Sequence, residues 1–382
     1  MWNFNLKQKN RYEIIMNKLS IILLFVLLLT DACTSGKAAL KSGNYYEAVI
    51  ESINRLRGNP THKKATEVLQ VGYPLAIEFI QSEIQNGMSA DDPRKWRNAV
   101  GGYQKINSLN QQIKTSPGAM KIISNPVTKF KELAEAKVKA AEESYNEGIQ
   151  FMLKNTREDA KLAYYRFQES NGYEPGYREV VELMNQAEFN ATLRVAYQEI
   201  NASRVNYGSI QPIILSLQRQ FLSFKPLEQQ DTVAPHQILK IVFNEYRIDN
   251  KPQISTRSEE LKRDVKVGEK KGADGKNQDV MESVSGTITY FTKSKRAFCG
   301  STFTITDTKS SGILQNNMVD GNSQWQNTWA TYKGDVRAMT NEQLTLTKRG
   351  ETSPDDQALF NQAISNLKDN LSQQLKSFYS RY

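Results

Sequence analysis

The stretch that decides the fold of the first half of this 382-residue chain is Ser42-Gly-Asn-Tyr-Tyr-Glu-Ala-Val-Ile-Glu-Ser-Ile-Asn-Arg-Leu-Arg-Gly-Asn-Pro60. Its apolar residues fall three and four positions apart, as they do along one face of a helix. The same spacing continues on both sides of this stretch, with few β-branched runs. Residues 33–188 are therefore predicted to form an all-α domain.

A second stretch, Asp159 to Pro175, repeats part of this pattern. In both copies a small residue, Ala48 or Ala163, precedes a proline by twelve positions. Together with Gly43, Tyr46, Phe167 and Ser170, this spacing resembles the second helix of a tetratricopeptide repeat. A weaker third copy begins at Trp96 and matches at Ala99, Tyr103 and Ile106, while Ser52 and Arg55 depart from the repeat pattern.

This resemblance implies a divergent tetratricopeptide-like array of helical hairpins, although the repeats have no uniform period. Such hairpins stack because one of them cannot bury its apolar face alone. The stack offers a concave surface that binds proteins far more often than it catalyses a reaction.

The pattern changes to strands near Ala191, so residues 190–382 are predicted to form an α+β domain. Residues 192–197 and 238–248 alternate as strands, and Ile210, Ile214, Leu217 and Phe221 have helical spacing. Residues 254–267 and 280–292 are predicted to be two long strands joined by a tip at 268–276. A separate strand is expected at 298–306, and residues 316–329 are expected to be a polar loop.

The chain ends in a well-marked amphipathic helix. Ser353 is the expected N-cap and Pro354 the first helical residue. One apolar stripe then runs along the helix and is expected to cover a mostly antiparallel sheet; it consists of Phe360, Ile364, Leu367, Leu371, Leu375 and Phe378.

Residues 1–32 are predicted to be a leader that does not belong to the fold, with translation starting at Met16. Residues 16–19 give a short basic start, and residues 21–29 are an apolar run too short to span a bilayer comfortably. The segment ends in Thr30-Asp31-Ala32-Cys33, which resembles the bacterial lipobox. That resemblance implies cleavage before Cys33 and acylation, including palmitate, of this cysteine.

The resemblance extends to lipoproteins of the Bacteroidetes type, and it places the protein at the cell outer membrane. Thr34 follows the cysteine where an inner-membrane protein has Asp, and no acidic run resembling a surface-export signal comes next. A lipid-anchored, periplasm-facing protein is therefore expected.

Net charge and cysteine content restrict which ligands and which stabilising bonds are expected for this protein. The net charge is +9, which in an exported protein favours anionic headgroups, glycans or peptidoglycan, and not nucleic acid. Once Cys33 is acylated only Cys299 remains, so no intrachain disulfide is expected.

Residues suited to catalysis are scarce, and the protein is predicted not to be an enzyme. His62 follows a proline and His236 lies in a connection, so neither accompanies a second metal ligand or a nucleophile. Cys299 is expected to be a buried small hydrophobe. No cofactor is expected beyond the covalent lipid.

Four aromatic residues are the candidates for binding a partner: Trp96 and Tyr103 in the helical part, and Trp325 and Trp329 in the polar segment. Trp325 and Trp329 share a face on either a helix or a strand, and exposed indoles suit protein interfaces or glycan stacking. The expected function is a scaffold or adaptor in envelope assembly or secretion. The alternatives are a subunit of a curli-type secretion channel, opposed by charges on both faces of residues 255–266, and a glycan-binding surface lipoprotein.

Overall fold

A computed structural model describes residues 36–89, 92–203, 205–229, 233–272 and 277–382. The described chain is a mixed α/β protein with a six-stranded, mostly antiparallel sheet. It divides into two compact units, which we call unit 1 (Met1–Ala191) and unit 2 (Thr192–Tyr382), and each is described by itself. The leader and Cys33 lie outside the described residues, so their expected processing remains a prediction.

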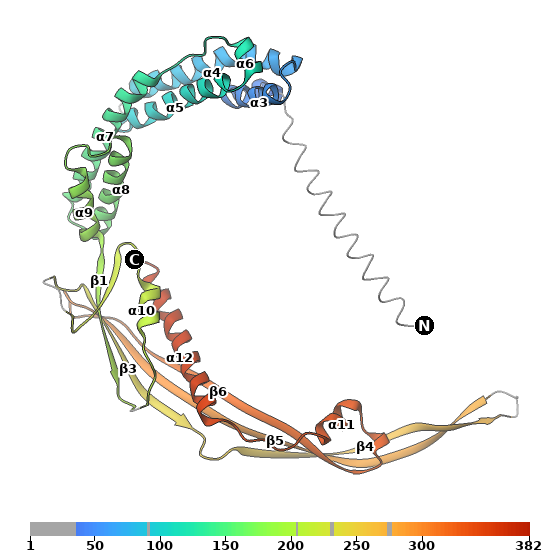
Figure 1. Ribbon diagram of the computed structural model, residues 1–382. Helices are drawn as coiled ribbons and strands as arrows, with labels where there is room; N and C mark the ends of the chain where they lie inside the picture. Colours follow the sequence, from blue (N-terminus) through green and yellow to red (C-terminus); the bar gives the residue numbers. More distant parts are fainter. Residues whose placement is uncertain (1–35, 90–91, 204, 230–232, 273–276) are drawn as a thin grey trace. The chain divides into compact units, whose positions relative to one another are not determined.

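Unit 1 consists of helices, each packed against helices near it in the chain (Figure 1). Between the described residues 36 and 191 these are α2 (Lys37–Lys41), α3 (Tyr45–Gly58), α4 (Lys63–Ser89), α5 (Lys95–Lys114), α6 (Pro117–Ile122), α7 (Phe130–Met152), α8 (Arg157–Tyr173) and α9 (Val180–Ala191). No described helix has the length and apolar content needed to cross a membrane.

Small residues allow the helices of unit 1 to approach closely. Ala48 on α3 and Ala163 on α8 are fully buried. At Gly148 on α7, an added Cβ would lie 2.6 Å from the ring of Phe167 on α8. Ser170 is also buried, and its hydroxyl donates to the carbonyl of Ala141 at 2.8 Å. At these positions one helix therefore packs directly against the backbone of its neighbour.

Unit 2 is built on one sheet. Its strands are β1 (Leu193–Asn201), β2 (Leu222–Pro226), β3 (Gln237–Ile248), β4 (Gln253–Lys271), β5 (Asn277–Asp307) and β6 (Ile313–Gly334). The order is β2-β1-β3-β5-β4, and β6 also pairs with β5. β1 runs parallel to both of its neighbours, whereas every pairing that involves β5 is antiparallel.

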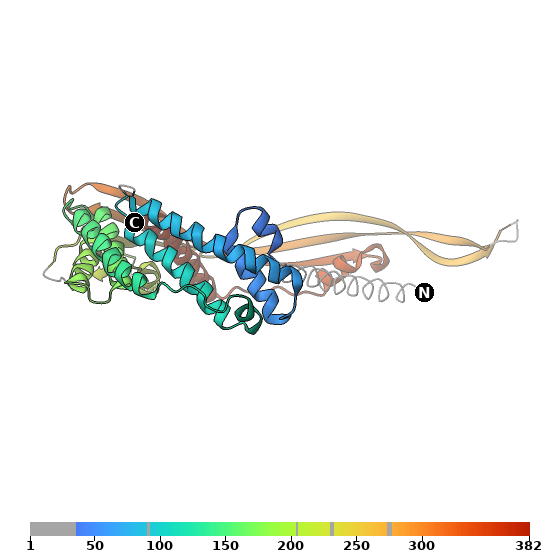
Figure 2. The same ribbon diagram turned by 90° about the horizontal axis from the view of Figure 1, so that it is seen from above.

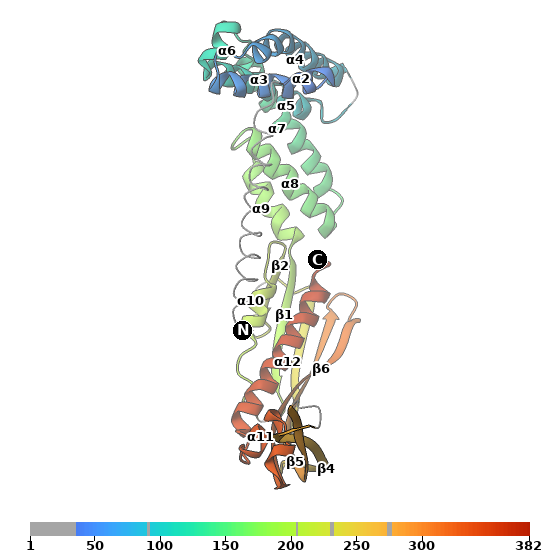
Figure 3. The same ribbon diagram turned by 90° about the vertical axis from the view of Figure 1, so that its right-hand side faces the viewer.

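Helix α12 (Asp356–Tyr379) lies along this sheet (Figure 3) and closes the core of unit 2. The apolar stripe expected from the sequence is buried, and it meets sheet residues such as Leu239, Phe243 and Phe303. Gly321 on β6 lets α12 come close, because an added Cβ would lie 2.2 Å from the carbonyl oxygen of Ala363. The short elements α10 (Gln211–Leu217), η2 (Val336–Ala338) and α11 (Asn341–Thr347) complete the described part of the unit.

β4 and β5 extend past the other elements of unit 2 as a ribbon, seen in Figures 1 and 2. The pairing of β6 with β5 ends at Gly286 and Gly334, so beyond it only β4 and β5 pair. Side chains of β4 are exposed on both faces along nearly its whole length. An antiparallel ribbon of this kind buries little surface of its own.

Three expectations about the strands are wrong. Residues 298–306 are not a separate strand but continue β5, which runs unbroken for 31 residues. Residues 316–329 are not a loop but most of β6. β4 extends to Lys271, so residues 268–271 belong to the strand and not to the hairpin tip.

Two helix boundaries also differ from expectation. Phe221 lies outside α10 and has a φ of 64°, so it does not continue the helical stripe. Asp355, and not Ser353, caps α12, because its carboxylate accepts hydrogen bonds from the N–H groups of Gln357 and Ala358. The capping carboxylate sits where the positive end of the helix dipole favours it.

Candidate partner-binding site

A shallow groove in unit 1 runs beside the start of α5 and along one side of α7. One part of it has a volume of about 430 Å³, and an adjoining part has about 370 Å³. The two parts share Pro93, Glu143 and Asn146. We call it the Trp96 groove; its other lining residues are Asp92, Lys95, Trp96, Lys139, Glu142, Glu147 and Gln150.

The floor of the Trp96 groove is formed where α7 caps α5. The N-cap residue of α5, Arg94, offers no capping side chain. Instead the carboxylate of Glu143 accepts hydrogen bonds from the N–H groups of Trp96 at 3.0 Å and Arg97 at 3.1 Å. The first N–H groups of a helix lack partners within it and favour an anion. Glu143 thus fixes the position of Trp96.

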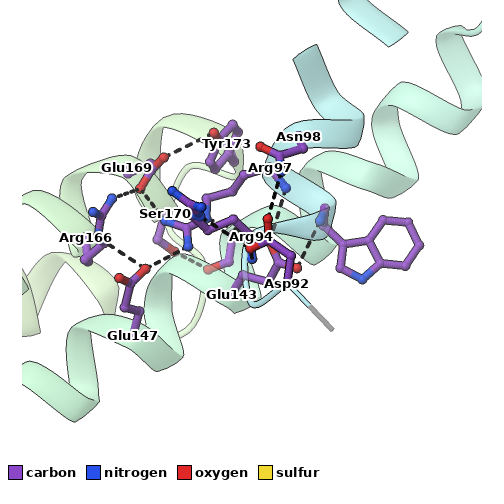
Figure 4. Close-up of polar contacts among 12 residues, drawn as sticks. Asp92, Arg94, Arg97, Asn98, Glu143, Glu147, Arg166, Glu169, Ser170 and Tyr173 are labelled. Atoms are coloured by element: carbon purple, nitrogen blue, oxygen red, sulfur yellow. Dashed lines mark hydrogen bonds and ion pairs between the residues drawn. The ribbon is translucent and has the colours of Figure 1, made fainter. Parts of the chain in front are cut away.

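Below the groove the guanidinium of Arg97 meets three carboxylates (Figure 4). Its nitrogens lie 2.8 Å from Glu147, 3.2 Å from Glu169 and 3.8 Å from Glu143. The Arg97 side chain is only 7% exposed, and a charge buried to this degree requires oppositely charged partners. Arg97 therefore ties α5 to both α7 and α8.

A second arginine, Arg166, closes the network from α8. It lies 3.3 Å from Glu147 and 2.7 Å from Glu169, while the hydroxyl of Tyr173 donates to Glu169 at 3.3 Å. Burial raises the pKa of Glu169, but the hydrogen bond from Arg166 and the charges of Arg97 and Arg166 outweigh it and leave that pKa below its usual value. Burial and the charge of Glu169 raise the pKa of Tyr173.

Asp92 and Pro93 form one wall of the Trp96 groove, and the carboxylate of Asp92 holds this wall in place. This carboxylate accepts hydrogen bonds from the N–H of Arg94 at 2.8 Å and from the amide of Asn98 at 3.3 Å. The backbone hydrogen bond from Arg94 is the main cause of the lowered pKa of Asp92. The groove therefore has a wall and a floor that are both fixed by charge-assisted hydrogen bonds.

Of the predicted partner-binding residues, Trp96 lies in the groove. Tyr103, on the same helix, is half-buried and packs with Trp96 against two apolar clusters of unit 1. Arg97 and its three glutamate partners are not among the residues predicted from the sequence. A signal for Arg97 exists, since it lies three residues before the buried Val100 and so shares its helical face.

The two tryptophans of unit 2 lie on one face of β6. Trp325 is partly buried against the core beneath α12. Trp329 is stacked on Phe291, with ring centroids 5.4 Å apart and planes 12° apart. Two of the four predicted residues thus belong to unit 1 and two to unit 2, and a partner-binding role for Trp325 and Trp329 remains a prediction.

Both histidines accept hydrogen bonds from backbone N–H groups, and Cys299 is buried in the sheet. Nδ1 of His62 accepts a hydrogen bond from the N–H of Ala65 at the start of α4, and Nδ1 of His236 accepts one from the N–H of Arg194. Cys299 is fully buried in β5, and burial raises the pKa of its thiol to about 11. A thiol with such a pKa is a poor nucleophile at neutral pH.

In the described ranges no group of three or more His, Cys, Asp or Glu residues is arranged to hold a metal ion. The Trp96 groove combines an aromatic ring, amides and charges of both signs on a fixed frame. That combination suits recognition of a polar, partly charged surface. Neither a protein family nor a curated protein matches this chain.

Proposed function

We propose that this protein is a non-catalytic scaffold of the bacterial envelope, held at the outer membrane by lipid on Cys33, which binds a partner protein through the Trp96 groove. The helices of unit 1 form a divergent tetratricopeptide-like array in this proposal. The partner is an envelope protein of an assembly or secretion system, and the groove faces the periplasm.

The observation that carries the proposal is the frame beneath the Trp96 groove. Three carboxylates and two arginines from α5, α7 and α8 form an ion network beneath the groove, and one of these carboxylates, Glu143, also holds the backbone N–H of Trp96. Replacing such a buried ion network by apolar residues often stabilises a fold, so stability alone is a weak reason for it. A fixed tryptophan in a polar setting is typical of the residues that dominate binding between proteins.

The charges around the groove favour a partner segment with basic side chains. Asp92, Glu142, Glu143 and Glu147 line it, against Lys95 and Lys139. Part of this negative charge is already neutralised by Arg97 within the chain. Complementary charge gives specificity and orientation more than affinity, so we expect Trp96 to supply most of the binding energy.

A photo-crosslinking residue placed at Asn146 tests the groove in intact cells. We expect it to capture one protein partner, and Trp96→Ala should reduce that capture at least about tenfold, as for other central tryptophans. The matched control carries the crosslinker at Lys64, which is exposed on α4. Capture of polysaccharide only, or equal capture from both positions, contradicts the proposal.

The anchor is tested separately by metabolic labelling with a fatty-acid analogue. We expect label on the wild-type protein and none on Cys33→Ser, because Cys33 supplies the only thiol that the lipobox-like segment offers. Label on the Cys33→Ser protein would rule out acylation at this cysteine.

A further inference from the structure

The outer edge of β4 is an unpaired strand edge that suits a second copy of this chain. β4 is the terminal strand of the sheet order, and β5 is its partner on the other side. From Gln253 to Lys266 its pairing with β5 is regular, and the register first shifts between Lys266 and Gly268. On the side that faces away from β5, the backbone N–H and C=O groups of these residues have no strand partner in the described ranges.

Geometry restricts how two such edges can pair antiparallel. In a strand, every second residue points its N–H and C=O groups to the same side. Two residues can therefore lie directly opposite each other only if both point these groups toward the partner strand or both point them away from it. When both strands are β4, the two-fold axis must therefore pass through a residue position and not between two residues. A strand paired with its own copy makes an isologous contact, the usual kind in dimers.

Charge then selects one of these registers. With the axis at Leu261, Glu259 lies opposite Arg263 of the second copy, and Glu260 lies opposite Lys262. Each pair occurs twice by symmetry, and no like charges face each other from Thr256 to Lys266. Opposite charges directly across a pair of strands are stabilising, and like charges there are destabilising.

Neighbouring registers lack this complementarity. An axis at Glu260 places Glu260 opposite itself and Arg257 opposite Arg263, while an axis at Lys262 places that lysine opposite itself. An axis at Ser258 avoids like charges but aligns only Arg257 with Glu259. Charges on edge strands usually prevent association. An axis at Val265 would also avoid like charges, but most of its opposite pairs lie across the bulge between Lys266 and Gly268. Within the regular segment from Gln253 to Lys266, the axis at Leu261 aligns the most opposite charges among the registers that bring no like charges face to face.

We propose that two copies of this chain associate through β4, antiparallel, about a two-fold axis at Leu261. Two of the side chains that carry the pairing are available as they stand, whereas Glu259 would exchange its ion pair with Arg257, and Arg263 its hydrogen bond to the carbonyl of Met339, for partners in the second copy. Glu260 and Lys262 are exposed, and across the described ranges neither makes an ion pair. Leu261 is half-buried against the cluster of Ile288, Ala330 and Met339, which fixes the strand at the axis. Dimerisation would join the sheets of the two copies into one continuous sheet and cover both β4 edges.

Exchanging the charges tests both the contact and its register. The full chain is used, with Cys33→Ser in every variant so that lipid does not hold copies together, and the molar mass is measured by light scattering. We expect a wild-type dimer. Glu260→Lys and Lys262→Glu should each raise the dissociation constant at least about tenfold, because each places like charges opposite each other twice.

Mixing the two single variants should restore the dimer. The lysine introduced in one chain then faces the glutamate introduced in the other, while the native Lys262 and Glu260 that remain also face each other. The double variant with both exchanges should also be a dimer. Lys270→Glu is the matched control, since Lys270 is exposed on the same strand but lies outside the paired residues. A monomeric wild type, an unaffected single variant, a monomeric mixture, or loss of the dimer in the control would each overturn the proposal.

Discussion

At the scale of single residues, one glycine decides how closely α12 approaches the sheet. Gly321 faces the backbone of α12, and a Cβ there would lie 2.2 Å from the carbonyl oxygen of Ala363 and 2.3 Å from the nitrogen of Leu367. Both atoms belong to the backbone of a buried helix face, so neither can move as the end of a flexible side chain does. Only displacement of the whole helix relieves such a clash.

We therefore expect Gly321→Ala to lower the free energy of unfolding of unit 2 by about 3 kcal/mol, at the upper end for overpacking. Gly350→Ala is the control, because an added Cβ there meets no atom within 4 Å. Urea unfolding followed by tryptophan fluorescence measures both. Equal, small changes for the two variants would mean that α12 does not lie this close to β6.

Glu169 makes the stability of unit 1 depend on pH. Its pKa is lowered from the ordinary value of 4.5, so the folded state holds the proton less tightly than the unfolded state does. The stability that this group contributes is therefore present above pH 4.5 and is lost as the pH falls through the lower, folded pKa.

We expect hydrogen exchange at α5, α7 and α8 to be faster in Glu169→Gln than in the wild type at pH 7, and this difference to shrink below pH 4.5. The exchange of α12 amides serves as an internal reference in the same protein. A difference between the two proteins that stays constant down to pH 3 would show that the charge of Glu169 contributes nothing.

At the scale of elements, the sequence predicts helices better than the strands of unit 2. The apolar stripe of α12 is predicted correctly, because a helix buried on one side repeats a local pattern. β5 is wrongly divided, because Lys293 and Lys295 interrupt its apolar alternation. In the structure these lysines are nearly buried and pair with Glu351 and Asp356, which lie 58 and 61 residues further along the chain.

The sequence does not predict that β6 is a strand, and the reason is related. Several residues of β6 that face α12 are small or polar, and some of them bond to the helix, while the apolar contacts on this face come from Val319 and Trp325. Ser323 donates to the carbonyl of Leu359 at 2.6 Å, and the amide of Asn317 donates to Gln374 at 3.0 Å. No local pattern reveals such partners. The same holds for the Arg97 network, in which Arg97 lies 46 residues from Glu143 and 72 from Glu169.

The cap of α12 offers a direct test of an element boundary. Asp355 accepts two backbone hydrogen bonds at the helix start, so Asp355→Ala should cost about 1 kcal/mol of stability. Ser353→Ala, at the position that the sequence favours, should cost almost nothing. Thermal melts of the two variants distinguish the caps, and the reverse order of stability would place the start of the helix at Ser353.

At the scale of the whole molecule, each unit has apolar clusters of its own. Each described cluster draws its residues from one unit only. We expect the fragments 36–191 and 192–382 each to unfold cooperatively when expressed alone. Calorimetry of each fragment checks this, and a fragment that melts without a heat-absorption peak would show that it depends on the rest of the chain.

The position of β1 has a mechanical consequence. The chain enters unit 2 through β1, which is hydrogen-bonded in parallel to β2 on one side and to β3 on the other. Tension applied at its first residue, Leu193, acts along the strand and loads both rows of hydrogen bonds at once, in shear. Bonds loaded together resist more force than bonds opened one after another. We therefore expect unit 2 to resist unfolding when it is pulled at Leu193 against a point held on β2 or β3.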